Sequence, residues 1–292
     1  MSEIEKNAPL FLTTKEVADL LRVKERKVYD LAAANEIPHR RITGKLLFPA
    51  QALRNWIDGD DNMDARDRPN VLAGSHDPLL DWAIRASGCG LATLCNGSRD
   101  GLAQFNAGSA LAAGLHLPGE DGWNVSAVSG SGSRNCVLIS WAVRKRGLLL
   151  SNDVARSVRT TSDLKGRRVA QRQPGAGAAL IFEKLLKDAS LSESDLVLCK
   201  DRAHTESDAA AAVASGEADA SLGIEAMARR FKLSFLPLTD EQFDLLIDRR
   251  SYFTEPVQTL LTYARTPEFL EKAEALGGYD LTDFGSVRWL SD

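Results

Sequence analysis

The chain has 292 residues, 44% of them hydrophobic and 26% charged, with a net charge of −4 at pH 7. This length predicts two or three globular domains. The acidic balance excludes a surface built throughout for nucleic acid, but it leaves room for a local basic patch. No apolar run approaches the roughly 20 residues of a membrane span, and the N-terminus has no apolar signal-peptide core. We therefore expect a cytoplasmic protein without a membrane partner.

The cysteines and histidines give no pattern of a metal site. The four cysteines, at positions 89, 95, 136 and 199, lack C-x-x-C spacing and lie among apolar residues. Reduced, buried thiols are expected rather than disulfides or a zinc site. The four histidines are scattered along the chain. We expect no bound metal and no resident cofactor.

Residues 11–57 have the pattern of a small, complete unit. Thr13 or Thr14 can cap a first helix, and a tight turn at Arg22 leads to a second. The apolar face of the first helix is formed by Val17, Ala18, Leu20 and Leu21. Residues 37–48 predict two short strands around a turn, and a third helix begins at Pro49. This order of elements is typical of a winged helix-turn-helix.

The same unit is locally basic. From position 22 to position 45 there are seven Lys or Arg and three acidic residues, an excess of four positive charges. Such an excess favours contact with DNA phosphates. The expected partner is double-stranded DNA, contacted by Lys24 at a phosphate, by Arg26, Lys27 and Tyr29 in the major groove, and by Arg40, Arg41 and Lys45 on the backbone. The alternative is a protein-interaction module with a solvated basic face.

Several short motifs in this unit occur together. They are LTTKEVADLLRV at 12–23, RKVY at 26–29, IP at 37–38, LF at 47–48 and WI at 56–57. With them the segment resembles the excisionase/MerR-type helix-turn-helix, which implies a winged helix-turn-helix DNA-binding domain over residues 1–58. Lys24 departs from that pattern, because the family commonly has a capping Ser there.

Residues 59–70 are polar and charged, which predicts a linker. From Val71 onward, strands and helices alternate. The expected strands are 71–73, 90–95, 113–117, 136–143, 147–150, 167–171, 195–199, 218–222, 233–238 and 258–264. The expected helices are 78–86, 100–110, 178–189, 205–215 and 224–231. This alternation predicts an α/β fold with a mostly parallel sheet.

The length of this second region suits two lobes. We expect lobe I at about 71–143 and 226–292 and lobe II at about 144–225. The hinge is expected where strands cross between the lobes, near 142–146 and 223–228.

The stretch QRQPGAG at 171–177 follows a short apolar strand and opens a helix. Free backbone N–H groups and the positive end of a helix dipole favour a small anion there. Arg172 adds a full positive charge. The G-A-G spacing matches neither a dinucleotide-binding motif nor a P-loop, so an ordinary strand-to-helix turn is the alternative.

Other strand-to-helix turns also carry small polar residues, and ligands of α/β sheets collect where such turns converge. The predicted ligand site consists of Ser75, Gly97, Ser98, Arg172, Gln173, Gly175, Ala176, Gly177, Thr205 and Glu225. The alternative for Ser75, Ser98 and Thr205 is that each hydroxyl only caps a helix.

An ordered series of motifs runs through this region. It includes Gly97-Ser98, His116-Leu117, Trp123-Asn124, Arg146-Gly147-Leu148, Arg172-Gln173-Pro174-Gly175, Val213 to Asp219 and Leu222 to Glu225. Over roughly residues 71–250 the chain resembles the cytoplasmic periplasmic-binding-protein-like domain of presumed molybdate-responsive regulators. The resemblance implies a two-lobed sensor domain and an oxyanion ligand such as molybdate or tungstate.

Two departures weaken the oxyanion assignment. Where relatives often read G-S-G-T-R, this chain has GAGAA at 175–179, which lacks two hydroxyls and an arginine. Where they often read Thr-His, it has Thr205-Glu206, which adds a carboxylate. Fewer donors and an added negative charge disfavour a divalent oxyanion, so a small organic acid or a cofactor is an alternative ligand.

The sequence is compatible with three functions. The first is a one-component transcriptional regulator, a homodimer or higher homo-oligomer, whose lobes close on a small anionic ligand. The second is an enzyme on the same two-lobed fold. Ser75-His76-Asp77 has the residue types of a catalytic triad, but adjacent positions cannot form one, and we expect no catalytic residues. The third is an excisionase-like architectural DNA-binding protein, which would not need a large second domain.

Overall fold

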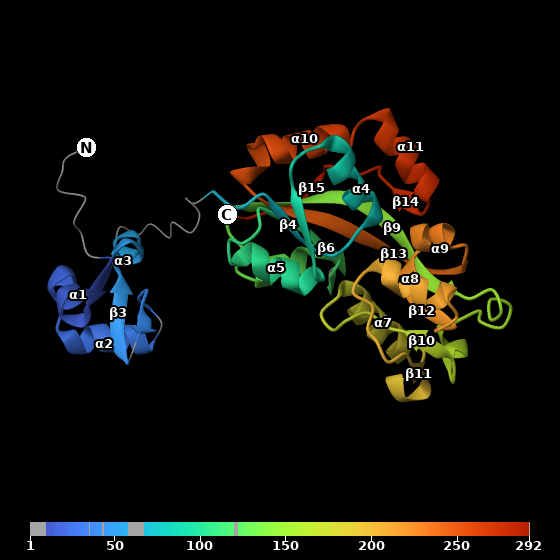
Figure 1. Ribbon diagram of the computed structural model, residues 1–292, viewed down its shortest axis with the longest axis horizontal. Coiled ribbons are helices and arrows are strands. Elements are labelled where there is room, and N and C mark those ends of the chain that lie inside the picture. Colours follow the sequence, from blue (N-terminus) through green and yellow to red (C-terminus); the bar gives the residue numbers. More distant parts are fainter. Residues whose placement is uncertain (1–9, 35, 43, 58–66, 120–121, 292) are drawn as a thin grey trace. The chain divides into compact units, whose positions relative to one another are not determined.

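The structure is a computed structural model that describes residues 10–34, 36–42, 44–57, 67–119 and 122–291. The chain divides into two compact units, Met1–Asp67 and Arg68–Asp292. Each unit has its own hydrophobic core. Figure 1 shows the small unit as short helices packed around a small sheet and the large unit as a twisted sheet covered by helices.

The small unit contains the predicted helix-turn-helix and hairpin. In chain order its elements are β1 (Phe11–Thr13), α1 (Thr14–Leu21), α2 (Glu25–Ala33), β2 (Arg40–Ile42), β3 (Lys45–Pro49) and α3 (Ala50–Ile57). The strands form one antiparallel sheet in the order β1-β3-β2. The sequence pattern did not predict β1, which pairs with the wing strand β3.

Local capping explains where α1 begins. Thr13 is its N-cap, with a side chain that accepts the Glu16 N–H, and the Glu16 carboxylate accepts the Thr13 N–H at 2.7 Å. This reciprocal capping box satisfies two backbone donors. Lys24, the N-cap of α2, makes no side-chain cap bond, as its departure from Ser implied. The prediction for Leu20 is wrong, because its side chain is 51% exposed rather than part of the core.

The large unit is built on a 10-stranded sheet. Its main path runs β11-β10-β12-β9-β13-β6-β4-β5, and β14 and β15 pair with β9 beside this path. The strands are β4 (Val71–Gly74), β5 (Ala92–Cys95), β6 (Ala112–Leu115), β9 (Cys136–Leu150), β10 (Arg168–Ala170), β11 (Val197–Leu198), β12 (Ala220–Ile224), β13 (Ser234–Asp248), β14 (Tyr279–Asp280) and β15 (Val287–Leu290). A separate small pair consists of β7 (Pro118–Gly119) and β8 (Gly122–Trp123).

The helices pack on both faces of this sheet. They are α4 (Pro78–Ser87), α5 (Ser98–Asn106), α6 (Val125–Gly130), α7 (Gly177–Asp188), α8 (Glu206–Ala214), α9 (Glu225–Phe231), α10 (Glu255–Tyr263) and α11 (Pro267–Leu276). Alternate residues of β9 face opposite cores: Ile139 packs with α4, α10 and α11, whereas Leu138 packs with α5 and α6. Figure 1 shows the same arrangement, with α5 across the sheet from α4 and α10.

β9 and β13 join the two halves of the sheet. They pair antiparallel from Asp248↔Cys136 at one end to Ser234↔Leu150 at the other. We use lobe I for the half around β4, β5 and β6 and lobe II for the half around β10, β11 and β12. Parallel pairs occur only within a lobe among the strands described here. The predicted α/β class is correct, but the sheet is mixed rather than mostly parallel.

The sequence pattern predicts that both crossing strands are interrupted near charged residues. It predicts strands at 136–143 and 147–150, separated by Arg144 to Arg146, and a strand at 233–238 that ends before Thr239. In the structure β9 and β13 continue through these positions, and Arg144, Arg146 and Glu241 are fully buried. Charged residues within an apolar run predict a loop, because isolated charges are rarely buried.

The lobe boundaries also shift. Gly223 lies inside β12, paired with Gly147, so 223–228 is not a crossing. The chain returns to lobe I through β13, whose Leu236 and Leu238 still pack on the lobe II core. We propose that lobe II extends to about residue 238 and that the hinge lies near 141–146 and 239–243.

Two further expectations are corrected. Residues 258–264, predicted as a strand, lie mostly in helix α10, where Val257, Leu260 and Leu261 are buried at helical spacing. The predicted linker 59–70 falls partly outside the described residues. Its last part belongs to the large unit, because Arg68 donates to the Ala110 carbonyl at 3.1 Å and pairs with Asp248 at 3.3 Å.

Candidate functional site

A chain of six buried charges lies where the two lobes meet. Arg144 and Arg146 are two residues apart on β9, so both point to the same face of the sheet. The Arg144 guanidinium donates to Asp77 at 2.9 Å and also to Glu241. Arg146 Nε donates to Glu241 Oε2 at 2.5 Å, and Arg146 Nη2 donates to Glu206 Oε1 at 2.8 Å. We call the set of Asp77, Arg144, Glu241, Arg146, Glu206 and Arg172 the charge chain.

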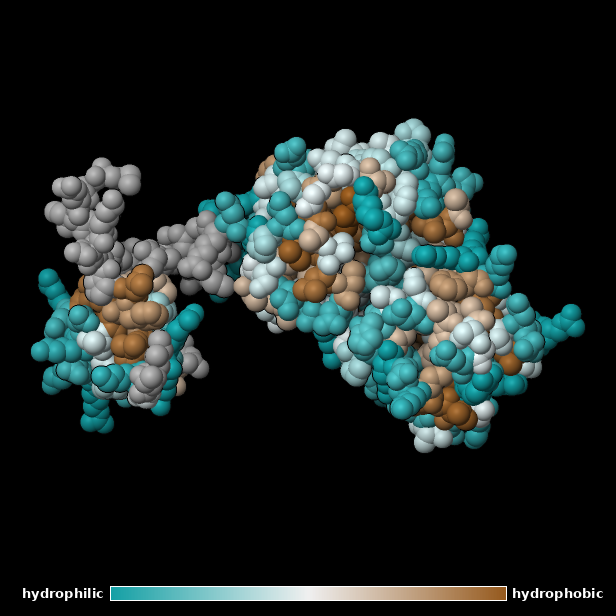
Figure 2. Space-filling view, in the orientation of Figure 1, coloured by the Kyte–Doolittle hydropathy of each residue, from teal (hydrophilic) through white to brown (hydrophobic). Residues whose placement is uncertain are grey.

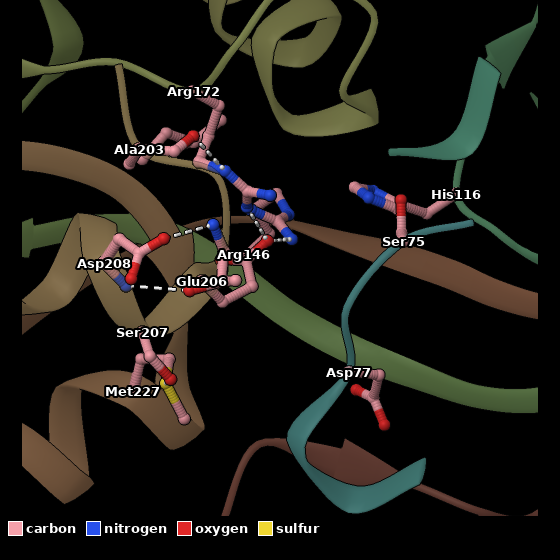
Figure 3. Close-up of polar contacts among 12 residues, drawn as sticks. Ser75, Asp77, His116, Arg146, Arg172, Ala203, Glu206, Ser207, Asp208 and Met227 are labelled. Carbon is pink, nitrogen blue, oxygen red and sulfur yellow. Dashed lines mark hydrogen bonds and ion pairs between the residues drawn. The ribbon is translucent and has the colours of Figure 1, made fainter. Parts of the chain in front are cut away.

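The charge chain ends at Arg172. Its Nη1 donates to Glu206 Oε1 at 2.9 Å, its Nη2 to the His204 carbonyl at 2.9 Å and its Nε to the Ala203 carbonyl at 3.2 Å. Figure 3 shows the Arg172 and Arg146 guanidinium groups side by side, both beside Glu206. The predicted role of Arg172 as a free cation for an anionic ligand is therefore modified, because its charge is already paired.

Burial and ion pairing act in opposite directions on these acids. Burial alone would raise the pKa of Glu206, but the charges of Arg146 and Arg172 outweigh it and hold that pKa at about 2. The pKa of Glu241 likewise lies well below its ordinary value, because Arg144 and Arg146 outweigh the burial. Both carboxylates are therefore ionised at neutral pH. Three positive and three negative side chains leave the charge chain with no net charge.

His116 borders the charge chain from lobe I. Burial lowers its pKa below the ordinary value despite the nearby Glu241 carboxylate, so the imidazole is neutral at pH 7. Its Nδ1 lies 3.1 Å from Glu241 Oε2. An ionised carboxylate can only accept, so Nδ1 carries the proton and Nε2 is left as an acceptor. In Figure 3 the His116 ring points toward the Arg172 guanidinium.

The predicted serines of lobe I meet each other beside His116. Ser75 Oγ and Ser98 Oγ are 2.8 Å apart, and the His116 backbone N–H donates to Ser98 Oγ at 3.1 Å. Neither serine is an N-cap: Asp77 caps α4 and Gly97 precedes α5. The capping alternative is therefore wrong for both, and their hydroxyls join the interlobe region.

The glycine turn of lobe II touches lobe I directly. The Arg99 backbone N–H donates to the Gly175 carbonyl at 3.4 Å. A Cβ added to Gly177, the first residue of α7, would lie 2.7 Å from His116 Cε1, and one added to Gly97 would lie 3.2 Å from Ala176 Cα. The absence of side chains at these positions lets the lobes approach.

Two predicted residues have other roles. Thr205 is the N-cap of α8, and its hydroxyl accepts the Asp208 N–H at 3.0 Å. Glu225 pairs with Arg229, four residues along α9, at 2.6 Å. The capping alternative is therefore correct for Thr205, and Glu225 lies apart from the charge chain.

Several buried polar atoms near the charge chain have no hydrogen-bond partner among the described residues. They include Glu206 Oε2, Arg144 Nε, Arg146 Nη1 and both amide atoms of Gln173. Most buried polar atoms of native proteins are paired. We use the name interlobe site for Ser75, Ser98, His116, Arg146, Arg172, Gln173 and Glu206.

A cavity of about 560 Å³ adjoins this site beside α7. Arg172 and Gly175 line it, together with Arg99 from lobe I and Arg202 and Leu186 from lobe II. A volume of this size accommodates a small organic molecule. Part of the predicted turn therefore faces a real cavity.

The predicted DNA contacts are accessible. Lys24, Arg26, Lys27, Tyr29, Arg40, Arg41 and Lys45 are all exposed. Cross-strand pairing places Arg40, opposite Leu47, on the same face of the wing as Lys45, and Arg41, opposite Leu46, on the other face. Figure 2 shows hydrophilic side chains projecting along the rim of this unit. The basic side chains are therefore accessible to DNA phosphates.

Sequence reasoning did not assign Asp77, Arg144, Arg146, Glu241 or His116 to the site, and it treated Glu206 only as a carboxylate added next to Thr205. For Arg144 and Arg146 the available signal was a charged residue within an otherwise apolar strand pattern. Among the described residues, no group of three or more His, Cys, Asp or Glu side chains is placed to hold a metal ion. No helix in the described ranges is long and apolar enough to cross a membrane.

Fold and site together define a helix-turn-helix protein with a two-lobed ligand-binding domain. Residues 82–265 match the PBP superfamily domain, and residues 11–60 match a helix-turn-helix domain. The chain belongs to the PBP superfamily, and the predicted fusion of the two domain types is confirmed.

One curated protein and two solved structures are similar to this chain. The uncharacterized protein YvgK of Bacillus subtilis is 25% identical over 94% of this chain and 96% of its own. PhnD1 from Prochlorococcus marinus, in complex with methylphosphonate, has a TM-score of 0.52 at 11% identity, covering 74% of this chain and 92% of PhnD1. The CcmR regulatory domain of Synechocystis, in complex with 2-PG, has a TM-score of 0.50 at 11% identity, covering 66% and 93%. These structural similarities show the fold alone.

Proposed function

We propose that this protein is a ligand-responsive, DNA-binding transcriptional regulator. The observation that carries the proposal is the interlobe site, where buried polar side chains of both lobes meet. The same protein also has a helix-turn-helix unit with exposed basic residues. A ligand at this site changes the balance between open and closed lobes only if it binds one arrangement more tightly. The strands near 141–146 and 239–243 are the proposed hinge.

The DNA-binding part rests on α2 and the wing. Arg26, Lys27 and Tyr29 are exposed on α2, the second helix of the motif, which enters the major groove in helix-turn-helix proteins. Arg40 and Lys45 share one face of the wing and Arg41 lies on the other, so we assign backbone contacts to the wing as a whole. Lys24 adds a phosphate contact at the start of α2. A homodimer is part of the proposal, because a single module makes few base contacts.

The ligand-binding part rests on the interlobe site and the adjoining cavity. PhnD1 and the CcmR regulatory domain share the fold, and their structures hold methylphosphonate and 2-PG. Backbone N–H groups at the start of α7 favour a hydrogen-bond acceptor on the ligand, whereas the charge of Arg172 is already paired with Glu206. The Glu206 carboxylate opposes a divalent oxyanion such as molybdate or tungstate. We therefore propose a small polar ligand as the effector.

A direct test begins with the full-length protein and fragmented genomic DNA. Fragments retained by the protein are sequenced and then titrated by fluorescence anisotropy at several salt concentrations. The logarithm of the affinity should fall linearly with the logarithm of the salt concentration. Lys24→Ala should make that slope shallower by about 1, because Lys24 is assigned to a phosphate. Lys165, an exposed basic residue of the large unit, provides the matched Lys165→Ala control.

The sensor function is tested with the retained fragment and a library of small polar metabolites. A true effector should change the DNA affinity of the wild type. At saturation it should also raise the free energy of unfolding by a few kcal/mol, which appears as a higher thermal midpoint. If no DNA sequence is enriched over the Arg26→Ala, Lys27→Ala double variant, the regulator function is rejected.

A further inference from the structure

Glu206 occupies a position built for an anion. It is the first residue of the nine-residue helix α8, next to the N-cap Thr205. Its carboxylate is fully buried, and Oε1 accepts from Arg146 Nη2 at 2.8 Å and from Arg172 Nη1 at 2.9 Å. A helix N-terminus and two guanidinium groups make a strong anion site. In this chain the anion is supplied by the protein itself.

We propose that Glu206 is a built-in occupant of the anion position, so that the effector of the interlobe site carries no net negative charge. The effector is then an uncharged or zwitterionic polar molecule rather than a free oxyanion. This inference rests on the proposed function only in assuming that the interlobe site binds the effector.

The charge balance carries the first part of this inference. Asp77, Glu206 and Glu241 offset the three arginines of the charge chain, and His116 is neutral. An added dianion would meet the ionised Glu206 carboxylate with no unmatched positive charge in the charge chain to offset it. Repulsion between like charges is strong in a buried site, because solvent screening is weak there.

The unpartnered polar atoms carry the second part. Glu206 Oε2 is an acceptor without a donor, Arg146 Nη1 is a donor without an acceptor, and the Gln173 amide offers one of each. A ligand with an N–H or O–H donor and a separate acceptor would satisfy both kinds of atom. Leaving them unpaired is unfavourable, which favours the binding of such a ligand. Zwitterions and neutral polar metabolites have this combination, whereas molybdate and sulfate carry only acceptors.

Removal of the built-in carboxylate should convert the site into one for free anions. Full-length wild type, Glu206→Ala and Asp208→Asn are titrated by calorimetry with acetate, phosphate and molybdate, in chloride buffer of matched ionic strength. Asp208→Asn removes one negative charge from the same helix end at an exposed position, so it controls for net charge. Glu206→Ala should bind at least one of these anions tenfold or more tightly than wild type and Asp208→Asn do, and the bound anion should raise its thermal midpoint.

The inference is overturned if wild type binds these anions as tightly as Glu206→Ala, or if Glu206→Ala gains no anion binding. Should Glu206→Ala fail to fold without added anion, Glu206→Gln keeps the shape of the side chain and removes its charge. Its thermal midpoint must then rise more with phosphate than that of wild type, or the inference fails. The proposed regulator function fails separately, if no DNA fragment is selected while the anion binding still appears.

Discussion

The ionised state of Glu206 provides the sharpest stability test of the charge chain. Glu206→Gln replaces a buried carboxylate with a neutral side chain of the same shape, close to what protonation would produce. The pKa of Glu206 is lowered from 4.5 to about 2. Each tenfold change in proton affinity is equivalent to about 1.4 kcal/mol. The substitution should therefore lower the free energy of unfolding at pH 7 by about 3 kcal/mol.

The direction of the pH dependence follows from the lowered pKa. The stabilisation by the Glu206 carboxylate is fully present above the unfolded value of 4.5 and is lost as the pH falls through the folded value of about 2. The difference in unfolding free energy between wild type and Glu206→Gln should fall from about 3 kcal/mol at pH 7 to about 2 kcal/mol at pH 3.5. In a unit of this size the loss at pH 7 corresponds to a thermal midpoint lowered by roughly 6–12 °C.

Urea unfolding followed by circular dichroism at both pH values measures this difference. Asp208→Asn is the control, since it removes an exposed carboxylate from the same helix end and should lower the unfolding free energy by about 1 kcal/mol at most. A difference for Glu206→Gln below about 1 kcal/mol at pH 7 would refute the reasoning. The reasoning would also be refuted if the difference in unfolding free energy between wild type and Glu206→Gln were the same at pH 7 and at pH 3.5.

Four other substitutions test separate parts of the structure. Gly177→Ala should force the lobes apart at His116 or destabilise the closed arrangement by about 1–3 kcal/mol. The first outcome increases the radius of gyration in X-ray scattering, and the second lowers the thermal midpoint. No change in either quantity would contradict the interlobe contact. Arg26→Ala should weaken specific DNA binding about tenfold or more without altering the thermal midpoint of the large unit. Thr13→Ala should destabilise the small unit by about 1 kcal/mol through loss of its cap, whereas an unchanged midpoint would argue against the capping box. Burial raises the pKa of Asp244 to about 6, so wild type should lose stability as the pH rises from about 4 to above 6, and Asp244→Asn should remove that loss in unfolding experiments.

The sequence alone was sufficient for the features that depend on local patterns. The capping residues at Thr13 and the spacing of Val17, Ala18 and Val28 specify the helix-turn-helix, because helix starts and apolar faces are set by neighbours a few residues apart. The glycine turn before α7 was found for the same reason. The alternation of apolar strands and helices after residue 70 predicts the α/β class. Together with the separate pattern of residues 11–57, it predicts two domain types in one chain.

Only the tertiary structure decided what occupies the interlobe site. Arg146 is separated along the chain from Glu206 by 60 residues and from Glu241 by 95 residues. Their pairing depends on how β9, α8 and β13 come together. In the sequence, Arg146 interrupts an apolar strand pattern, and Glu206 stands among polar residues at a predicted helix start. In the fold each is buried because an opposite charge from another element lies within hydrogen-bond distance, which sequence spacing does not reveal. The sequence predicts an anion site at the turn 171–177, and in the structure the protein's own Glu206 pairs with Arg146 and Arg172 beside that turn.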